Sequence, residues 1–366
     1  MKRIALLVVL TQLIASCAIK TYPDSKDLEF IYSTILENHP GIYNERDADF
    51  RLNLENSYSK AKEAIKQSKS NSSSKNIISD IATSFNDEHL WGYWFDNRAK
   101  KQSSKISNFS ISDLSDEVSW IRLPSFSLKS EQENNFNELI KHISNLRIKK
   151  YIVFDLRGNQ GGNSDYGTQI IKALFGNEYA NYEKCINNKK LFADWRASEG
   201  NLSHISSLLD RYPSLDWLQD VKDGLKESLD KGEPFYREYS SQTCKGANLI
   251  FKPDFKFQII VITDSLNVSA ALDFIDELKI MTSKITLIGQ KTKADRLYME
   301  VRSVKLPSGS GKFFFPIKVY RNRPRLDNQP YVPDIYFQDI HDINALQNFI
   351  LEKIKSPQNA NPKGRK

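Results

Sequence analysis

The chain has 366 residues, of which 40% are hydrophobic and 27% charged, and its formal net charge is +7. This length allows roughly two domains with a sizeable core. Part of the positive charge lies at the two ends, and the other lysines are scattered and seldom alternate with aromatic side chains. The composition therefore argues against a nucleic-acid-binding protein, and no nucleic-acid partner is predicted.

Residues 1–16 have the features of a secretory signal peptide. Lys2 and Arg3 precede an apolar run over residues 4–14, which is shorter than the roughly 20 residues of a membrane-spanning helix. The run leads into LIASC at residues 13–17, which resembles the lipobox of bacterial lipoproteins. This resemblance implies that Cys17 is acylated and anchors the protein in a membrane. The alternative is an ordinary cleaved signal peptide.

The residues after Cys17 indicate the membrane at which the protein is located. Ala18 and Ile19 follow, without the aspartate that commonly retains lipoproteins at the inner membrane. We therefore expect a lipid-anchored protein of the bacterial cell envelope, at the outer membrane and facing the periplasm or the cell surface. In such an oxidising compartment Cys185 and Cys244 are expected to form a disulfide.

Residues 17–100 are predicted to form an N-terminal helical cap. Apolar side chains recur at helical spacing in three stretches, which cover residues 27–35, 52–65 and 77–85. His89 follows the last of them and precedes an aromatic strand. It is a candidate base, and the alternative is a histidine that is merely hydrogen-bonded at the edge of a core.

Residues 101–345 are predicted to form an α/β core with a β-α-β order of elements. The apolar run at residues 151–154 indicates a central, buried strand. A turn rich in glycine follows at residues 155–162, at the end of a strand where α/β sheets usually bind ligands. The alternative is a structural turn whose glycines only allow tight packing.

A second buried strand is expected at residues 257–263, with Ser269 at the start of the helix that follows. Ser269 could act as a nucleophile, and the alternative is an N-cap. Residues 185–244 form a polar, largely helical insertion that we interpret as an embellishment or a lid. Residues 346–366 are assigned to the end of a C-terminal helix and a basic tail.

Four motifs occur in the order found in the tail-specific, or C-terminal processing, serine protease family, which the chain resembles. They are DEH at 87–89, DLRGNQGG at 155–162, NVSAA at 267–271 and VPDI at 332–335. The likeness is to the branch with tricorn-type proteases and interphotoreceptor retinoid-binding proteins. It implies a ClpP/crotonase-like α/β fold and a serine endopeptidase of the cell envelope, with a polypeptide as substrate.

Carried over to this sequence, the resemblance assigns Ser269 as the nucleophile and His89 as the general base. Asp327 would orient the histidine, at a position where the family has a glutamate. The oxyanion hole would combine the N–H of Gly161 or Gly162 with that of Ala270.

The bacterial processing branch of the family uses a Ser-Lys dyad instead. The position of that lysine is Asp295 here. Lys291 and Lys293 are the nearest substitutes, but a lysine that must lose its proton near neutral pH needs burial, and this segment is polar. We therefore favour the Ser-His-Asp arrangement.

Other departures leave a second hypothesis open. Leu272 replaces a glutamate of the family, and too little chain separates His89 from Val118 for a PDZ domain. The second hypothesis is a non-catalytic peptide- or lipid-binding protein that retains the protease fold. No HExxH or CxxC motif occurs, so no metal site and no cofactor are predicted. The sequence does not indicate an oligomeric state.

Overall fold

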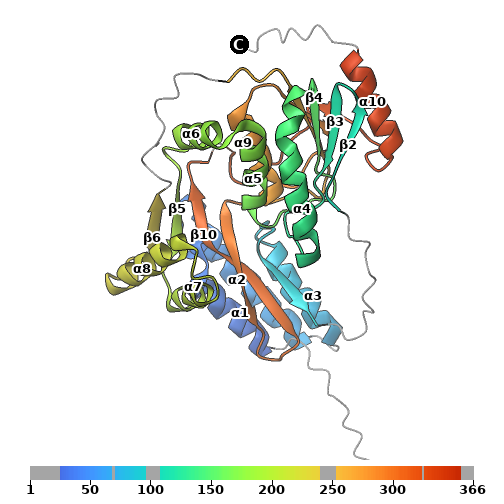
Figure 1. The fold of residues 1–366 in the computed structure, drawn as a ribbon. Coiled ribbons are helices and arrows are strands. Elements are labelled where there is room, and N and C mark those ends of the chain that lie inside the picture. Colours follow the sequence, from blue (N-terminus) through green and yellow to red (C-terminus); the bar gives the residue numbers. More distant parts are fainter. Residues whose placement is uncertain (1–24, 68–70, 96–107, 240–252, 324, 356–366) are drawn as a thin grey trace, which may run out of the picture.

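The computed structural model describes residues 25–67, 71–95, 108–239, 253–323 and 325–355. The α-helices are α1 (Ser25–Asn38), α2 (Phe50–Gln67), α3 (Asn71–Thr83), α4 (Ser130–Ile143), α5 (Ser164–Phe175), α6 (Asn177–Asn187), α7 (Glu199–Arg211), α8 (Asp216–Asp230), α9 (Ala270–Met281) and α10 (Ile343–Lys355). The strands are β1 (Trp91–Trp94), β2 (Ser110–Ser115), β3 (Val118–Arg122), β4 (Tyr151–Asp155), β5 (Phe192–Arg196), β6 (Phe235–Tyr239), β7 (Gln258–Thr263), β8 (Ile285–Gly289), β9 (Tyr298–Lys305), β10 (Gly311–Arg321) and β11 (Ile335–Tyr336). Figure 1 shows these elements arranged in two lobes, with β2, β3 and β4 in the upper lobe and α1, α2 and α3 in the lower lobe.

The upper lobe is built on a six-stranded sheet with the strand order β11-β8-β7-β4-β3-β2. The strands from β11 to β3 are parallel, and β2 joins the edge antiparallel to β3. β4 lies between β3 and β7, so residues 151–154 form a central strand, as the sequence predicted. Ile152, Val153 and Phe154 are fully buried, because both faces of the sheet are covered. The predicted α/β fold class is confirmed.

Helices cover both faces of this sheet (Figure 1). On one face α4, α5 and α9 pack against the strands, and Phe274 of α9 contacts Phe154 of β4 with ring centroids 5.2 Å apart. On the other face Ile350 of α10 belongs to a separate apolar cluster with Val153. The two clusters hold β4 rigidly, and with it the turn that leaves its carboxyl end.

The lower lobe is built on a five-stranded sheet. In this sheet β10 pairs with β1, β5 and β9, and β5 pairs with β6, all antiparallel. One apolar cluster contains Leu28 of α1, Phe50 of α2, Trp195 of β5, Leu225 of α8 and Phe313 of β10. The N-terminal helices and the elements from β5 to β6 therefore share one core, instead of forming a separate cap and insertion.

This arrangement differs from the boundaries expected from the sequence. Helices were expected within residues 185–244, and α7 and α8 are present, but β5 and β6 were not anticipated. Each of these strands has five residues, FADWR and FYREY, with charged side chains among the apolar ones. A pattern this short does not distinguish a strand from a loop, and the pairing of β5 with β6 and β10 joins distant parts of the chain.

Candidate active site

Two turns lie side by side at the carboxyl ends of β4 and β7. We call residues 156–163 the glycine turn and residues 264–269 the serine turn. Because β4 and β7 are parallel neighbours, both turns leave the same edge of the sheet. Asn267 joins them, since its Nδ2 donates to the main-chain oxygens of Leu156 at 2.6 Å and Asn159 at 3.1 Å. The glycine turn is thus fixed against the start of α9.

The glycine turn approaches the serine turn too closely for a side chain. A Cβ on Gly161 would lie 2.7 Å from the main-chain oxygen of Val268 and 2.8 Å from Cβ of Ser269. A Cβ on Gly162 would lie 2.1 Å from the main-chain oxygen of Phe126. Both glycines also have positive φ, 85° and 135°, which side-chain-bearing residues rarely adopt. Gly161 therefore permits the contact with Ser269, and Gly162 permits the contact with Phe126.

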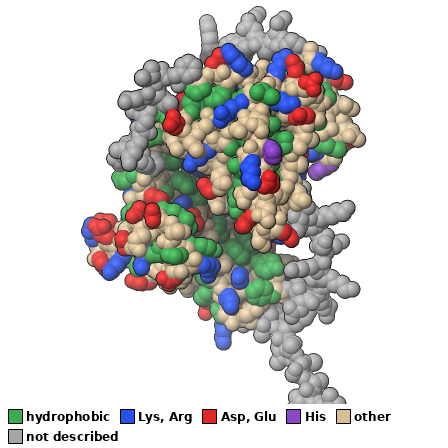
Figure 2. All heavy atoms as spheres, in the orientation of Figure 1, with side chains coloured by type: hydrophobic (Ala, Val, Ile, Leu, Met, Phe, Trp, Pro, Cys, Tyr) green, Lys and Arg blue, Asp and Glu red, His purple; other side chains and the backbone are tan. Residues whose placement is uncertain are grey.

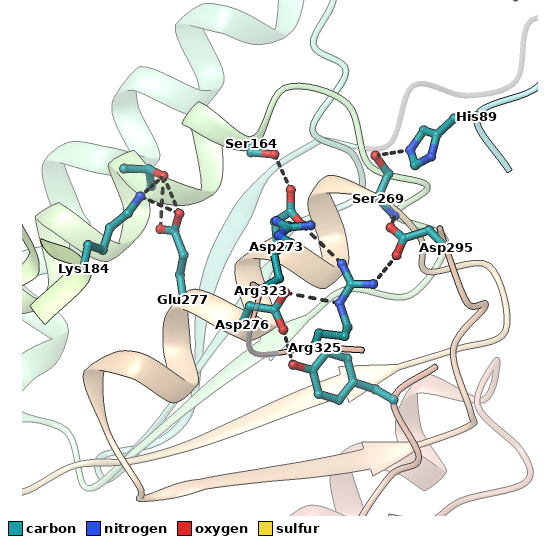
Figure 3. Close-up of polar contacts among 12 residues, drawn as sticks. His89, Ser164, Lys184, Ser269, Asp273, Asp276, Glu277, Asp295, Arg323 and Arg325 are labelled. Carbon is teal, nitrogen blue, oxygen red and sulfur yellow. Dashed lines mark hydrogen bonds and ion pairs between the residues drawn. The ribbon is translucent and has the colours of Figure 1, made fainter. Parts of the chain in front are cut away.

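Ser269 and His89 meet from opposite lobes. Ser269 occupies the N-cap position of α9, but its side chain makes no capping hydrogen bond. Instead its Oγ lies 3.0 Å from Nε2 of His89, which comes from the loop between α3 and β1. Figure 3 shows the two side chains facing each other. The backbone of Ser269 has φ 58° and ψ −126°, a conformation that costs of order 1–3 kcal/mol in a residue other than glycine.

Asp87 is the carboxylate beside the imidazole of His89. Its Oδ1 accepts the backbone N–H of His89 at 3.0 Å and lies 3.4 Å from Nδ1. Both side chains are buried, and within the described residues Nδ1 of His89 and Oδ2 of Asp87 have no hydrogen-bond partner. A proton on Nδ1 would face Asp87 and leave Nε2 free to accept the hydroxyl proton of Ser269.

The pKa of His89 is raised above its ordinary value. Burial alone lowers this pKa, but the contact with Asp87 and the charges of Asp87, Asp295 and Asp273 outweigh the effect of burial. The same negative charges would stabilise the imidazolium that forms when His89 takes up a proton.

The structure does not bring Asp327 to His89. Oδ1 of Asp327 accepts the backbone N–H of Leu297 at 2.8 Å, and Oδ2 lies 3.2 Å from Nη2 of Arg296. Its side chain is 44% exposed. The expectation that Asp327 orients the histidine therefore disagrees with these contacts. Asp87 is better placed to orient the histidine, because it lies two residues from His89 and accepts a hydrogen bond from the main chain of His89.

The three N–H groups expected in the oxyanion hole differ in their availability. The N–H of Gly161 donates to Oδ1 of Asn159 at 2.9 Å and is therefore occupied. The N–H groups of Gly162 and Ala270 have no hydrogen-bond acceptor among the described residues. Ala270 begins α9, where the first N–H groups lack partners within the helix, and Gly162 lines the same cleft as Ser269.

Neither lysine considered for a Ser-Lys dyad is in a suitable position. Lys291 is exposed, and Nζ of Lys293 pairs with Oε2 of Glu88 at 2.8 Å, with 36% of the lysine side chain exposed. At the position of the dyad lysine, Oδ2 of Asp295 accepts the backbone N–H of Ser269 at 3.0 Å. In the sequence Asp295 stands out only as a departure from the family, and no local pattern indicates this contact.

A cleft of about 830 Å³ opens in front of Ser269 and His89, between the two lobes. Figure 2 shows the surface hollowed between the upper lobe and the part formed by α7 and α8. The wall opposite the serine turn belongs to β1, β9 and β10 and carries Trp91, Met299, Val301 and Phe314. The rings of Trp91 and Phe314 stack with centroids 3.8 Å apart. The same wall also carries Glu300 and Lys318, so it combines apolar side chains with two charged ones, whereas the wall formed by the two turns is polar.

Other predictions of the sequence analysis concern cysteines, metals and the membrane. Cys185, in α6, is disulfide-bonded, whereas Cys244 and Cys17 lie outside the described residues. No cluster of His, Cys, Asp and Glu suited to a metal ion occurs in the ranges given above. No helix among those ranges has both the length and the apolar character needed to cross a bilayer.

Comparison with known proteins gives the following similarities. The model of peptidase family S41 matches residues 117–336, which is more than half of the chain. No protein of curated function matches the chain.

Several solved structures are similar, including the following three. A putative peptidase from Parabacteroides merdae has a TM-score of 0.50 and 15% identity, over 90% of this chain and 96% of that one. A lipoprotein from Streptococcus agalactiae has a TM-score of 0.48 and 14% identity, over 90% and 97%. A putative S41 protease from Bacteroides fragilis has a TM-score of 0.36 and 14% identity, over 67% and 57%. At such identities the first of these indicates a similar fold and no more.

Proposed function

Because the chain belongs to peptidase family S41 and is by family a serine peptidase, we propose that Ser269, His89 and Asp87 form its catalytic arrangement. In this proposal the protein is a serine endopeptidase that cleaves polypeptides. The observation that carries the proposal is the 3.0 Å distance between Oγ of Ser269 and Nε2 of His89. That distance lies within the range expected of a nucleophile and its base.

Each residue has a defined task in this mechanism. Oγ of Ser269 attacks the scissile carbonyl carbon while Nε2 of His89 takes the hydroxyl proton. Asp87 holds the ring in the required tautomer and stabilises the imidazolium. His89 then returns the proton to the leaving amine, and a water molecule hydrolyses the acyl-enzyme by the same route.

The developing oxyanion requires donors that are already in place. The N–H groups of Gly162 and Ala270 are the candidates, because the N–H of Gly161 is engaged by Asn159. In other serine proteases the loss of one such donor typically costs about 3 kcal/mol of the barrier. Gly161 contributes by allowing the glycine turn to approach Ser269.

The cleft supports a polypeptide substrate. A volume of about 830 Å³ is sufficient for several consecutive side chains, since pockets that bind drug-sized ligands measure about 300–1,000 Å³. Trp91, Met299, Val301 and Phe314 would contact apolar side chains of the substrate.

We also propose that the enzyme acts in the cell envelope, held by an acyl anchor on Cys17. The support for this proposal is the sequence of residues 1–17 alone. Metabolic labelling with a fatty acid tests it, because Cys17→Ser would abolish labelling and release the protein from the membrane fraction.

A fluorophosphonate probe tests the catalytic proposal. We expect the probe to label Ser269, labelling to disappear in Ser269→Ala, and the labelling rate to fall in His89→Ala by about 10²–10⁴-fold. Ser127→Ala is a matched control, since Ser127 lines the same cleft and should leave labelling unchanged. Equal labelling of wild type and His89→Ala would contradict the role of the base. Absence of both labelling and peptide hydrolysis in the wild type would favour the non-catalytic binding protein.

A further inference from the structure

The backbone of Ser269 is held by a buried carboxylate. Its N–H donates to Oδ2 of Asp295 at 3.0 Å, and the side chain of Asp295 is fully buried. A serine at this position would ordinarily turn its hydroxyl toward the first N–H groups of the helix. Ser269 does not cap the helix and keeps a positive φ of 58°. The side chain of Ser269 therefore does not maintain this backbone conformation, and another group must do so.

The carboxylate of Asp295 is itself held by a second contact, on the oxygen that does not bind Ser269. Its Oδ1 contacts Nη1 of Arg325, whose side chain is only 3% exposed. Nε of Arg325 donates to Oδ2 of Asp276 at 3.2 Å, and the main-chain oxygen of Asp295 accepts the N–H of Asn328 at 2.9 Å. Figure 3 shows this chain of contacts running from Arg325 through Asp295 to Ser269. The carboxylate consequently has little freedom to leave Ser269.

The surrounding charges offset part of the cost of burying this carboxylate, since burial raises the pKa of Asp295 and Arg325 lowers it. Arg323 and Arg325 face Asp273, Asp276 and Asp295, so two positive groups meet three negative ones. The excess negative charge lies beneath the N-terminus of α9, where a helix dipole favours it. Asp295 is also one of the charges that act on His89, together with Asp87 and Asp273.

We propose that Asp295 is a positioning residue for the nucleophile, and that Arg325 holds it in place. Asp295 draws the N–H of Ser269 into the protein interior, which fixes the peptide plane and turns Oγ toward Nε2 of His89. The next N–H, that of Ala270, is thereby left available to a substrate oxygen. Without this anchor the peptide before Ser269 rotates, φ returns to an ordinary value and Oγ moves away from the imidazole. The proposal rests on the function proposed above.

Three variants test this role. In Asp295→Ala the anchor is lost, and we expect kcat to fall by about 10²-fold or more at an unchanged KM, because small misplacements of a reacting atom have effects of that size. Asp295→Asn keeps an oxygen that can accept the N–H of Ser269, so kcat should recover in part. Asp276→Asn is the matched control, since it makes the same change of charge in the same cluster without contact to Ser269, and its kcat should stay close to that of the wild type.

Two further measurements separate positioning from a structural role. Removing the charge of Asp295 should lower the pKa of His89, so the acidic limb of kcat/KM should move to lower pH in Asp295→Asn and stay in place in Asp276→Asn. Crystal structures should show Ser269 with positive φ in the wild type and with an ordinary negative φ in Asp295→Ala. If Asp295→Ala does not fold, the positioning role is tested with Asp295→Asn, by its kcat and by the acidic limb of its pH profile of kcat/KM.

The failures of the two proposals are distinguishable. An inactive, unlabelled wild type would refute the proposed function, and the φ of Ser269 in Asp295→Ala would still decide whether Asp295 holds the backbone. An active wild type together with full kcat in Asp295→Ala, or an unchanged positive φ in that variant, would overturn the positioning role.

Discussion

The carboxylate of Asp87 contacts His89 at two points, because the same Oδ1 accepts the backbone N–H at 3.0 Å and lies 3.4 Å from Nδ1 of the ring. A main-chain bond of this kind fixes the carboxylate before any substrate arrives. The 3.4 Å contact is longer than a normal hydrogen bond. A small rotation of the imidazole would shorten it and would give Nδ1 of His89 a hydrogen-bond partner.

The first prediction concerns this pair. In Asp87→Asn we expect kcat/KM to fall by about 10²–10⁴-fold, because the ring loses the group that selects its tautomer. Asp87 also contributes to the raised pKa of His89. The acidic limb of the pH profile should therefore shift to lower pH in this variant.

Asp327→Asn is the matched control for that prediction. Asp327 bonds to Leu297 and Arg296 and is 44% exposed. We expect its activity and pH profile to resemble those of the wild type. A large loss in Asp327→Asn with full activity in Asp87→Asn would restore the arrangement inferred from the sequence.

The second prediction concerns the glycine turn. In Gly161→Ala the new Cβ would collide with Val268 and Ser269, so the serine turn must move and activity should fall by about 10²-fold. Gly158→Ala is the control, since Gly158 also has positive φ but open space around it. Gly158→Ala should lose about 1–2 kcal/mol of stability from backbone strain and keep its kcat. If the two variants have comparable kcat values, the close approach of Gly161 to Ser269 is not required for activity.

The third prediction concerns the pH dependence of stability. His39 is fully buried, accepts the N–H of Gly41 on Nδ1 at 2.9 Å and stacks on Phe50. Burial lowers the pKa of His39 to about 3. In the unfolded chain the pKa of this histidine is about 6.5. At pH values between about 3 and 6.5 the unfolded chain therefore binds a proton that the folded protein does not. Stability should therefore be fully present above about pH 6.5 and decrease as the pH falls, by up to about 1.4 kcal/mol per pH unit.

His39→Asn tests this prediction by denaturant unfolding at several pH values. Asparagine keeps an acceptor for the N–H of Gly41 but does not titrate. We expect a smaller decrease of stability between pH 6.5 and pH 4 than in the wild type. An identical pH dependence in both proteins would assign the effect to other groups.

The fourth prediction concerns the disulfide. Cys185 is disulfide-bonded, and we predict Cys244 as its partner. Alkylation of the native protein should modify neither cysteine without reductant and both with it, which a mass spectrum shows. Closing a loop of about 60 residues should contribute roughly 4 kcal/mol of stability. Two alkylated thiols in the unreduced protein would contradict the pairing.

Local patterns predicted the parts of the site that depend on neighbouring residues. The central strand at 151–154, the glycine turn and the position of Ser269 at the start of a helix each follow from a short stretch of sequence. The order of four motifs then indicated that Ser269 and His89 belong together. In the structure Oγ of Ser269 lies 3.0 Å from Nε2 of His89.

The contacts that depend on tertiary folding could not be read in this way. Asp87, Asp295 and Asp327 are all carboxylates near a motif, and spacing along the chain does not show which of them turns toward the imidazole. The direction of the Asp327 side chain is determined by Arg296 and Leu297. β5 and β6 were missed for the same reason, since they acquire their conformation by pairing with distant strands.

The origin of His89 and Ser269 in different lobes has a consequence for how activity appears during folding. A chain in which only the six-stranded sheet has formed carries the alcohol without its proton acceptor, and the other lobe alone carries the acceptor without the alcohol. We therefore expect newly made or partly unfolded molecules to be harmless to surrounding polypeptides. Hydrolysis begins only when both lobes have docked, so the onset of turnover during refolding reports the final assembly step.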